Sequence, residues 1–438
     1  MIKLYLSIRL VKISEVLFLC QYGIYFLVLL CMYSMGIAPN FAYMGFLDAF
    51  SSENLVISLL MLLFVVPFLR PGQLPSAFFL NLTASLILVP TLVLYTGAGL
   101  PHRFALVTTA ALVLMAIISK TIRLRAFKLP VIHSSNLLLV LGYFSAFTVA
   151  GIFVFGGARF LNFDLSAVYD LRREAAQNLP IIFSYLVPLV SKVAIPFAIV
   201  FAIRDRHWLV VAGLVSLSVL LFALTAHKSP LFFPVMVIFV YFIARSRYVE
   251  QYFLAALISI VLASAIDIWF FSRGGEGVSG WFASLFTRRV LLVPSFLNWC
   301  YLDFFFDAEK YFWAESKITA GLIEPPFDLR SVNLIGLEYF GKEEMSANTG
   351  WIGSGYANAG LWGVMLYSIL IGVLLAFLDS YSYRLGKQII VALFVLPIFT
   401  IITSTDFLTM FLTHGLLLSL LLLALMNSTD PTANESLT

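Results

Sequence analysis

Long uninterrupted apolar runs are the feature that most constrains this chain. Stretches such as LVISLLMLLFVV carry no charge, and similar runs recur along most of the sequence. A helix that crosses a bilayer needs about 17–25 predominantly apolar residues, whereas membrane barrel strands alternate apolar and polar residues. Only 11% of the 438 residues are charged, and soluble domains carry about 25%. The sequence therefore predicts an all-α polytopic integral membrane protein and excludes soluble domains, disorder and disulfide scaffolds.

Twelve segments have the length and composition of membrane spans. They are 14–35, 54–69, 76–96, 104–119, 134–156, 180–203, 208–226, 229–244, 251–271, 357–378, 388–404 and 407–426. No small-residue cleavage site follows the basic N-terminal stretch, so the first helix is expected to be retained. Residues 1–271 would hold helices 1–9, with a medium loop at 157–179. A large loop at 272–356 would precede helices 10–12 at 357–426 and a tail at 427–438.

The distribution of Lys and Arg predicts the orientation of these spans. Cytoplasmic loops are enriched in positive residues. Fourteen of the 27 Lys and Arg residues lie on the side of the N-terminus, which places both termini in the cytoplasm and both long loops outside. The apolar stretch 290–306 contains Pro294 and Asp303, so we expect a helix in the outer interface there. A thirteenth span is the alternative.

Ten Lys and Arg residues face outward against this rule, and Arg288-Arg289 stands out because apolar stretches flank it. Arginine donates two parallel hydrogen bonds to phosphate and stays charged. The pair is expected either to hold a phosphate or diphosphate or to reach lipid headgroups from a helix end. For Arg172-Arg173, beside Glu174, a solvated pair is the competing interpretation.

Several further residues are candidates for binding. In the outer turn 226–230, His227, Lys228 and Ser229 could face an anion, and an interfacial lysine is the alternative. Within the spans, Lys192, Asp267 and His414 are costly to bury and mark functional hypotheses. A structural Lys192–Asp267 ion pair explains two of them equally well, and His414 more often makes a simple polar contact.

The remaining motifs are less specific. Cys20, Cys31 and Cys300 show no ligand spacing and no HExxH occurs, so no metal site is indicated. The glycine-rich stretch NTGWIGSGYANAGLWG at 348–363 is neither a Walker loop nor a dinucleotide fingerprint. Close packing of helices through small residues, or a close backbone approach to a ligand, would explain it.

The layout resembles the bacterial O-antigen polymerase (Wzy) family of oligosaccharide repeat unit polymerases, which have large third and fifth outer loops. The likeness rests on RRVLLVP at 288–294, the aromatic residues 301–306 and the glycine-rich stretch. The family's Arg-x10-Gly pattern fits Arg330 and Gly341 but fails in the third loop, where Asp170 follows Arg159 at that spacing.

The resemblance implies a GT-C-like glycosyltransferase of the bacterial inner membrane, with its active site on the periplasmic side. It would transfer a growing glycan from undecaprenyl diphosphate to the non-reducing end of a new lipid-linked repeat unit, without a cofactor. Membrane lipids and a separate chain-length regulator are the implied partners, and no nucleic acid is expected. Catalytic roles are expected for Arg288, Arg289 and Arg172, and substrate-binding roles for Lys228, His227, Arg159, Arg173, Arg273, Arg330, Asn348 and Tyr356.

Two rival functions remain. An O-antigen ligase shares the donor but uses a histidine in its large outer loop, and 272–356 contains none. A lipid-linked oligosaccharide flippase would show two similar halves and a charged central cavity.

Overall fold

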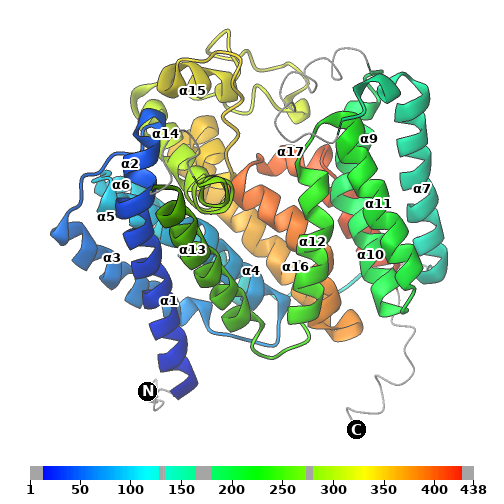
Figure 1. The fold of residues 1–438 in the computed structure, drawn as a ribbon, viewed down its shortest axis with the longest axis horizontal. Helices are drawn as coiled ribbons and strands as arrows, with labels where there is room; N and C mark the ends of the chain where they lie inside the picture. Colours follow the sequence, from blue (N-terminus) through cyan, green and yellow to red (C-terminus); the bar gives the residue numbers. More distant parts are fainter. Residues whose placement is uncertain (1–12, 128–131, 133, 163–178, 273–279, 427–438) are drawn as a thin grey trace, which may run out of the picture. The chain divides into compact units, whose positions relative to one another are not determined.

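The computed structural model describes residues 13–127, 132, 134–162, 179–272 and 280–426 (Figure 1). Helices form almost all of the regular structure in these ranges, which confirms the all-α prediction. All twelve expected segments fall in helical regions. Ten helices in the described ranges are long and apolar enough to cross a membrane, and two shorter apolar helices accompany them.

The helices follow one another with short connections. The first group is α1 (Ile13–Met32), η1 (Tyr33–Ile37), α2 (Ala38–Phe41), η2 (Ala42–Met44), α3 (Ser52–Val65), η3 (Val66–Leu69), α4 (Pro75–Thr83), η4 (Ala84–Leu88), α5 (Val89–Gly97), α6 (His102–Thr121), α7 (Ser134–Val154) and η5 (Gly157–Phe160). The second is α9 (Phe183–Leu189), η6 (Val190–Ala194), α10 (Ile195–Arg204), α11 (Trp208–Thr225), α12 (Ser229–Ile243), α13 (Val249–Ser272), η7 (Ala283–Leu292), α14 (Val293–Asp307), η8 (Lys317–Thr319), α15 (Ser331–Phe340), α16 (Trp351–Thr403), α17 (Phe407–Leu412) and α18 (Leu416–Leu425).

Prolines explain where the helices widen into π-helical turns. Each π segment ends two residues before a proline: Tyr33–Ile37 before Pro39, Ala84–Leu88 before Pro90, Val190–Ala194 before Pro196 and Ala283–Leu292 before Pro294. Proline has no N–H to donate, and its ring clashes with the carbonyl four residues earlier in a regular α-helix. A widened turn relieves that clash while the helix continues, so these prolines bend spans without ending them.

The structure differs from the expected boundaries in three places. The spans expected at 357–378 and 388–404 lie in one helical run, α16, which is interrupted at Ala359–Gly360 and at Gly386. Gly386 has φ of 79°, a conformation that favours glycine, and it separates the two spans. The span expected at 407–426 is broken into α17 and α18 at residues 413–415. The stretch expected at the interface belongs to a continuous helix, Ala283–Asp307, that is long enough to cross.

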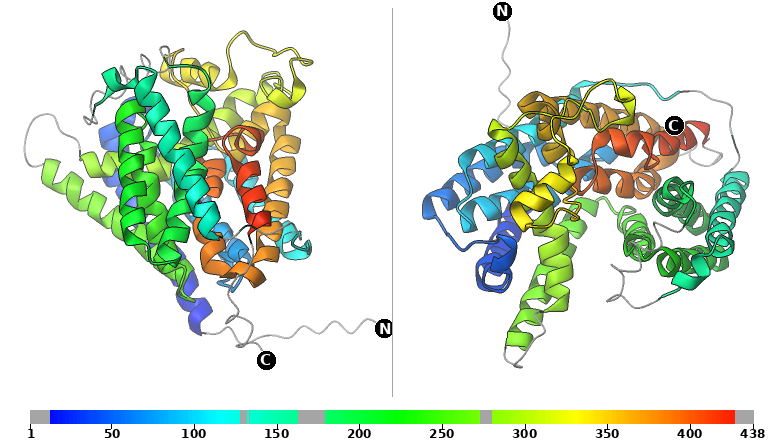
Figure 2. Two further views of the ribbon diagram at one scale, coloured as in Figure 1. Left: turned by 90° about the vertical axis from the view of Figure 1, so that its right-hand side faces the viewer. Right: turned by 90° about the horizontal axis from the view of Figure 1, so that it is seen from above.

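The chain divides into two compact units. Unit 1 comprises Met1–Pro71, Ala84–Val113 and Glu250–Phe296, and unit 2 comprises Gly72–Thr83, Leu114–Val249 and Leu297–Thr438. In unit 2, α10 is almost wholly buried and packs against α7, α11 and α12, while α16 packs against α4 and α12 (Figures 1 and 2).

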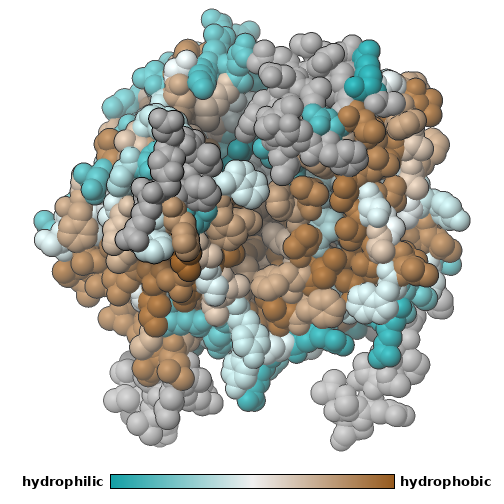
Figure 3. Space-filling model, in the orientation of Figure 1, coloured by the Kyte–Doolittle hydropathy of each residue, from teal (hydrophilic) through white to brown (hydrophobic). Residues whose placement is uncertain are grey.

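The outer surfaces of the unit 2 helices are apolar. Large side chains such as Tyr143, Phe147 and Val154 of α7 and Leu209 of α11 are exposed, and apolar side chains gather over α11 and α12 in Figure 3. A monomeric soluble protein rarely exposes a continuous apolar surface of this kind. This surface is suited to contact with lipid.

Asn298 joins two parts of unit 2 through buried hydrogen bonds. Its Oδ1 accepts from the Thr349 hydroxyl at 2.7 Å and from the Gly353 backbone N–H at 3.0 Å. Asn298 is fully buried on α14, and its partners lie at the start of α16. Because water cannot replace a buried acceptor easily, this side chain stabilises the glycine-rich stretch.

We expect Asn298→Ala to lower the free energy of unfolding by about 2 kcal/mol, because two buried donors lose their acceptor. Thermal unfolding of the detergent-purified protein measures this effect. Asn40→Ala is the matched control, since Asn40 is exposed and bonds only the carbonyl of Gly36 in its own helical region. Equal stability of the two variants would contradict the prediction.

Candidate functional site

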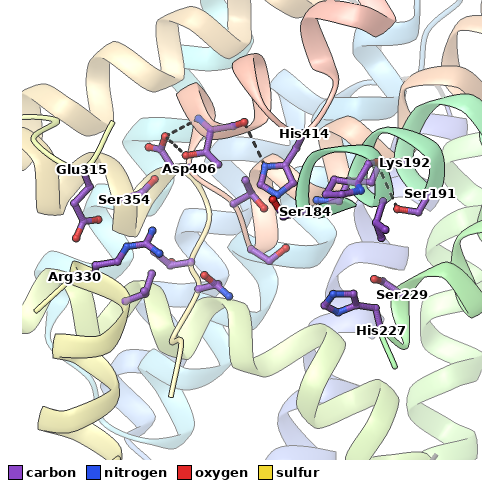
Figure 4. A pocket seen from close by; sticks show the side chains of 18 of the residues that line it. Ser184, Ser191, Lys192, His227, Ser229, Glu315, Arg330, Ser354, Asp406 and His414 are labelled. Carbon is purple, nitrogen blue, oxygen red and sulfur yellow. Dashed lines mark hydrogen bonds between the residues drawn. The ribbon is translucent and has the colours of Figure 1, made fainter. Parts of the chain in front are cut away.

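A cavity of about 870 Å³ lies within unit 2 (Figure 4). Its walls come from α9 and η6, the turn after α11, α14, the loop 311–316, the start of α15, the start of α16, and the breaks before α17 and α18. Span residues and outer-loop residues therefore meet in one space. The charged and titratable side chains that line it are Lys192, His227, Glu315, Arg330, Asp406 and His414.

Lys192 lies at the deepest chemically active position. It belongs to the π-helical turn η6, between Pro188 and Pro196. Lysine within a span is costly unless it is paired or faces a polar cavity. No described carboxylate forms an ion pair or hydrogen bond with it, and its side chain lines the cavity. A cation placed in this way is suited to an anionic ligand that enters the cavity.

Asp267, the ion-pair partner considered for Lys192, has a different role. It belongs to unit 1, where its Oδ2 accepts a hydrogen bond from the Ala283 backbone N–H at 2.9 Å. The carboxylate thus stabilises the beginning of η7. The structural ion pair with Lys192 is not formed.

His414 lies beside Lys192, close enough for the two groups to interact electrostatically (Figure 4). The histidine occupies the break between α17 and α18, and its Nδ1 is 3.3 Å from the Thr409 carbonyl oxygen and 3.2 Å from the Thr413 hydroxyl. A second wall of the cavity thereby carries a titratable nitrogen opposite the widened turn that bears Lys192.

The outer loops supply a second cationic group. Arg330 precedes the first residue of α15, where its backbone carbonyl accepts from the N–H groups of Asn333 and Leu334. Its side chain is exposed, lines the cavity and forms no ion pair with any described carboxylate. His227 and Ser229 line another wall, on the turn that follows the left-handed residue Ala226.

Two carboxylates line the same cavity, and each has its own donors. Glu315 accepts from the Ser331 backbone N–H at 2.5 Å and from the Ser331 hydroxyl at 2.8 Å, so it stabilises the beginning of α15. Asp406 accepts from the Tyr367 hydroxyl at 2.6 Å and from Thr409. Burial, and then the negative charge of Glu315, raises the pKa of the Tyr311 hydroxyl, while Arg330 opposes this shift. Tyr311 therefore remains a neutral donor to the Leu329 carbonyl.

The cavity brings together three of the predicted binding residues, His227, Arg330 and Asn348. Lys228 is adjacent in sequence, and its carbonyl accepts from the Leu231 N–H near the start of α12. Tyr356 is buried beside Lys310, whose ammonium lies 5.9 Å from the centre of its ring. Burial lowers the pKa of Lys310. Arg159 is exposed in η5.

The Arg288-Arg289 pair belongs to unit 1, whereas the residues that line the cavity all belong to unit 2. The Arg288 guanidinium lies 4.6 Å from the centre of the Phe41 ring, and it donates to the Ser284 hydroxyl at 2.7 Å and to the Met44 sulfur at 2.9 Å. Arg289 is exposed. These contacts give Arg288 a packing role within unit 1, and action on a phosphate stays a prediction for both.

Arg172, Arg173 and Arg273 lie outside the described residues. The sequence had pointed to Lys192 and His414 as costly intramembrane groups, but it did not assign them to a site with Arg330. Asp406 was noted only as part of a polar break. A signal was present in the two prolines around Lys192, because they bend the helix where a side chain must face something polar.

The glycine-rich stretch serves helix packing. A Cβ at Gly355 would lie 2.9 Å from the backbone of Gly363, and one at Gly350 would meet the backbone of Ile401 and Ile402. Small residues are needed where backbones approach this closely in a membrane protein. The stretch holds Ser354 and Asn358 against the cavity as a consequence.

The fold defines a polytopic α-helical membrane protein with a polar cavity built from spans and outer loops. No protein-family model, curated protein or solved structure matches the chain. Within the described ranges, no group of three or more His, Cys, Asp and Glu residues is arranged to hold a metal ion.

Proposed function

We propose that this protein polymerises polyprenyl-diphosphate-linked oligosaccharide repeat units at the outer face of the bacterial inner membrane. The observation that carries the proposal is the cavity of unit 2, in which Lys192 and Arg330 lie without a carboxylate partner among the described residues. Uncompensated cations at the boundary of a span and an outer loop suit a lipid-linked diphosphate, whose lipid tail remains in the bilayer.

The chemistry needs few groups. The anomeric carbon of such a donor already carries a diphosphate leaving group, so neither a nucleotide site nor a cofactor is required. Lys192 and Arg330 would stabilise the negative charge that develops on the departing diphosphate. His227, Ser229 and Asn348 would donate hydrogen bonds to the diphosphate or the first sugars. Trp313 and Tyr301 also line the cavity, and Trp313 would pack against a sugar ring.

Ligation of the same donor onto a different acceptor is the second candidate. Two histidines, His227 and His414, line the cavity although the loop 272–356 contains none. Ligases of the resembled kind use a histidine from that loop. The same donor site serves both reactions, and only the acceptor distinguishes them.

Purified protein reconstituted with undecaprenyl-diphosphate-linked repeat units is the decisive experiment. We expect a ladder of elongated lipid-linked glycans and release of undecaprenyl diphosphate. Cells that lack the protein should carry a lipid core with one repeat unit instead of a ladder. Transfer to a lipid core alone would identify a ligase, and transport across the vesicle without bond formation would identify a flippase. Either result would overturn the proposal.

A further inference from the structure

Asp406 occupies a distinctive place in the cavity. It lies in the turn between α16 and α17, is partly exposed to the cavity, and stabilises the beginning of α17. Its Oδ1 accepts from the Thr409 backbone N–H at 3.0 Å and from the Thr409 hydroxyl at 3.3 Å. Its Oδ2 accepts from the Tyr367 hydroxyl at 2.6 Å. The carboxylate is therefore held in one orientation by three donors.

The direction of these hydrogen bonds follows from Trp313. The indole N–H can only donate, and it donates to the Tyr367 hydroxyl oxygen at 2.7 Å. The Tyr367 oxygen acts as the acceptor in that bond, so its own proton points to Asp406. Every described donor around the carboxylate stabilises its ionised form.

Asp406 retains one acceptor position that faces the cavity side of the chain of bonds. A carboxylate offers about four lone-pair positions, and the printed contacts use two on Oδ1 and one on Oδ2. The other carboxylate in the cavity, Glu315, is exposed and binds both the N–H and the hydroxyl of Ser331, so it acts as a stabiliser of α15. A ligand hydroxyl thus finds a fixed, ionised acceptor at Asp406.

Trp313 provides an apolar surface next to this acceptor. Its backbone has φ of 63°, which is strained for a bulky residue. Its N–H donates to Asn358 Oδ1 at 2.9 Å, and its carbonyl accepts from the Thr319 hydroxyl at 3.0 Å, which together hold the conformation. A rigid indole beside a carboxylate is a combination that suits a sugar, because the ring packs on the apolar face while the carboxylate accepts a hydroxyl proton.

We infer that Asp406 is the catalytic base and that Asp406, Trp313 and Tyr367 form the acceptor-sugar subsite. This inference rests on the proposed function. The acceptor hydroxyl oxygen attacks the anomeric carbon of the donor and forms the new glycosidic bond. The bond between that carbon and the phosphate oxygen breaks, and its electron pair leaves with the diphosphate. The hydroxyl proton passes to Oδ2 of Asp406 and from there to water.

Asp406→Asn tests the assignment, because asparagine stabilises a helix N-terminus as well as aspartate does but cannot take the proton. We expect kcat for elongation to fall by about 100-fold or more, while the dissociation constant for the lipid-linked donor stays within about threefold. Tyr367→Phe removes one donor to the carboxylate and should lower kcat less. Asp328→Asn is the control, since Asp328 is an exposed loop carboxylate that does not line the cavity.

The outcomes separate the two proposals. A ladder from the unaltered protein together with kcat of Asp406→Asn within about threefold would overturn the catalytic-base assignment alone. No product from the unaltered protein would overturn the proposed function, and the present inference with it. If Asp406→Asn unfolds at a lower temperature, Asp406→Ser, which keeps an N-terminal acceptor, gives the same comparison with a different side chain.

Discussion

Lys192→Met is expected to reduce polymerisation by about 1,000-fold, because the variant loses a cation that stabilises the leaving diphosphate in a cavity of low polarity. Methionine has a similar length and no charge, so the shape of the wall is retained. An unpaired cation in a span destabilises the fold. Its removal should therefore leave the unfolding temperature unchanged or slightly raised.

This combination of lost activity and preserved stability distinguishes a ligand-binding lysine from a structural one. A lysine that held the fold together would lower the unfolding temperature when it was replaced. Lys342→Met is the matched control, because Lys342 lies on the exposed part of the outer loop and does not line the cavity. Lys192→Arg keeps the charge and should retain part of the activity. Normal ladders from Lys192→Met would refute the diphosphate assignment.

Gly363→Val should have the largest effect on stability, a loss of about 3 kcal/mol or more, because the added side chain would collide with backbone atoms. A Cβ at Gly363 would fall on the backbone carbonyl of Gly355, and neither side of that contact is a flexible side chain. The first turns of α16 would have to move away from its next segment, and with them the wall that carries Ser354 and Asn358.

Gly213→Val provides the control for this substitution. Gly213 lies on α11 in the same unit, and a Cβ there would have no atom within 4 Å. Both variants replace a glycine in a helical region with the same side chain, so propensity differences largely cancel. Fluorescence-detected size-exclusion chromatography after heating measures the two unfolding temperatures. If the temperatures agree, the close approach of residues 355 and 363 is not what limits substitution.

Hydrophobic patterning made the fold class predictable, since an apolar run of span length has few alternatives to a helix in lipid. The positions of Lys192 and His414 as costly groups were equally evident. The interruptions of α16 at Gly386 and of the last span at residues 413–415 were less so, because single polar or glycine residues do not reveal whether a helix continues. The stretch 290–306 was ambiguous for the same reason, and packing decided that it forms a continuous helix.

What the sequence alone determined was the material: apolar spans, a retained excess of outer cations and four prolines that bend helices without ending them. Only the tertiary structure decided which charges meet. Arg288 packs on Phe41 within unit 1, whereas Lys192, Arg330 and Asp406, separated by more than a hundred residues of intervening chain in part, line one cavity of unit 2. The physical reason is that a site depends on distances between side chains, and helix packing sets those distances while the order of residues along the chain does not.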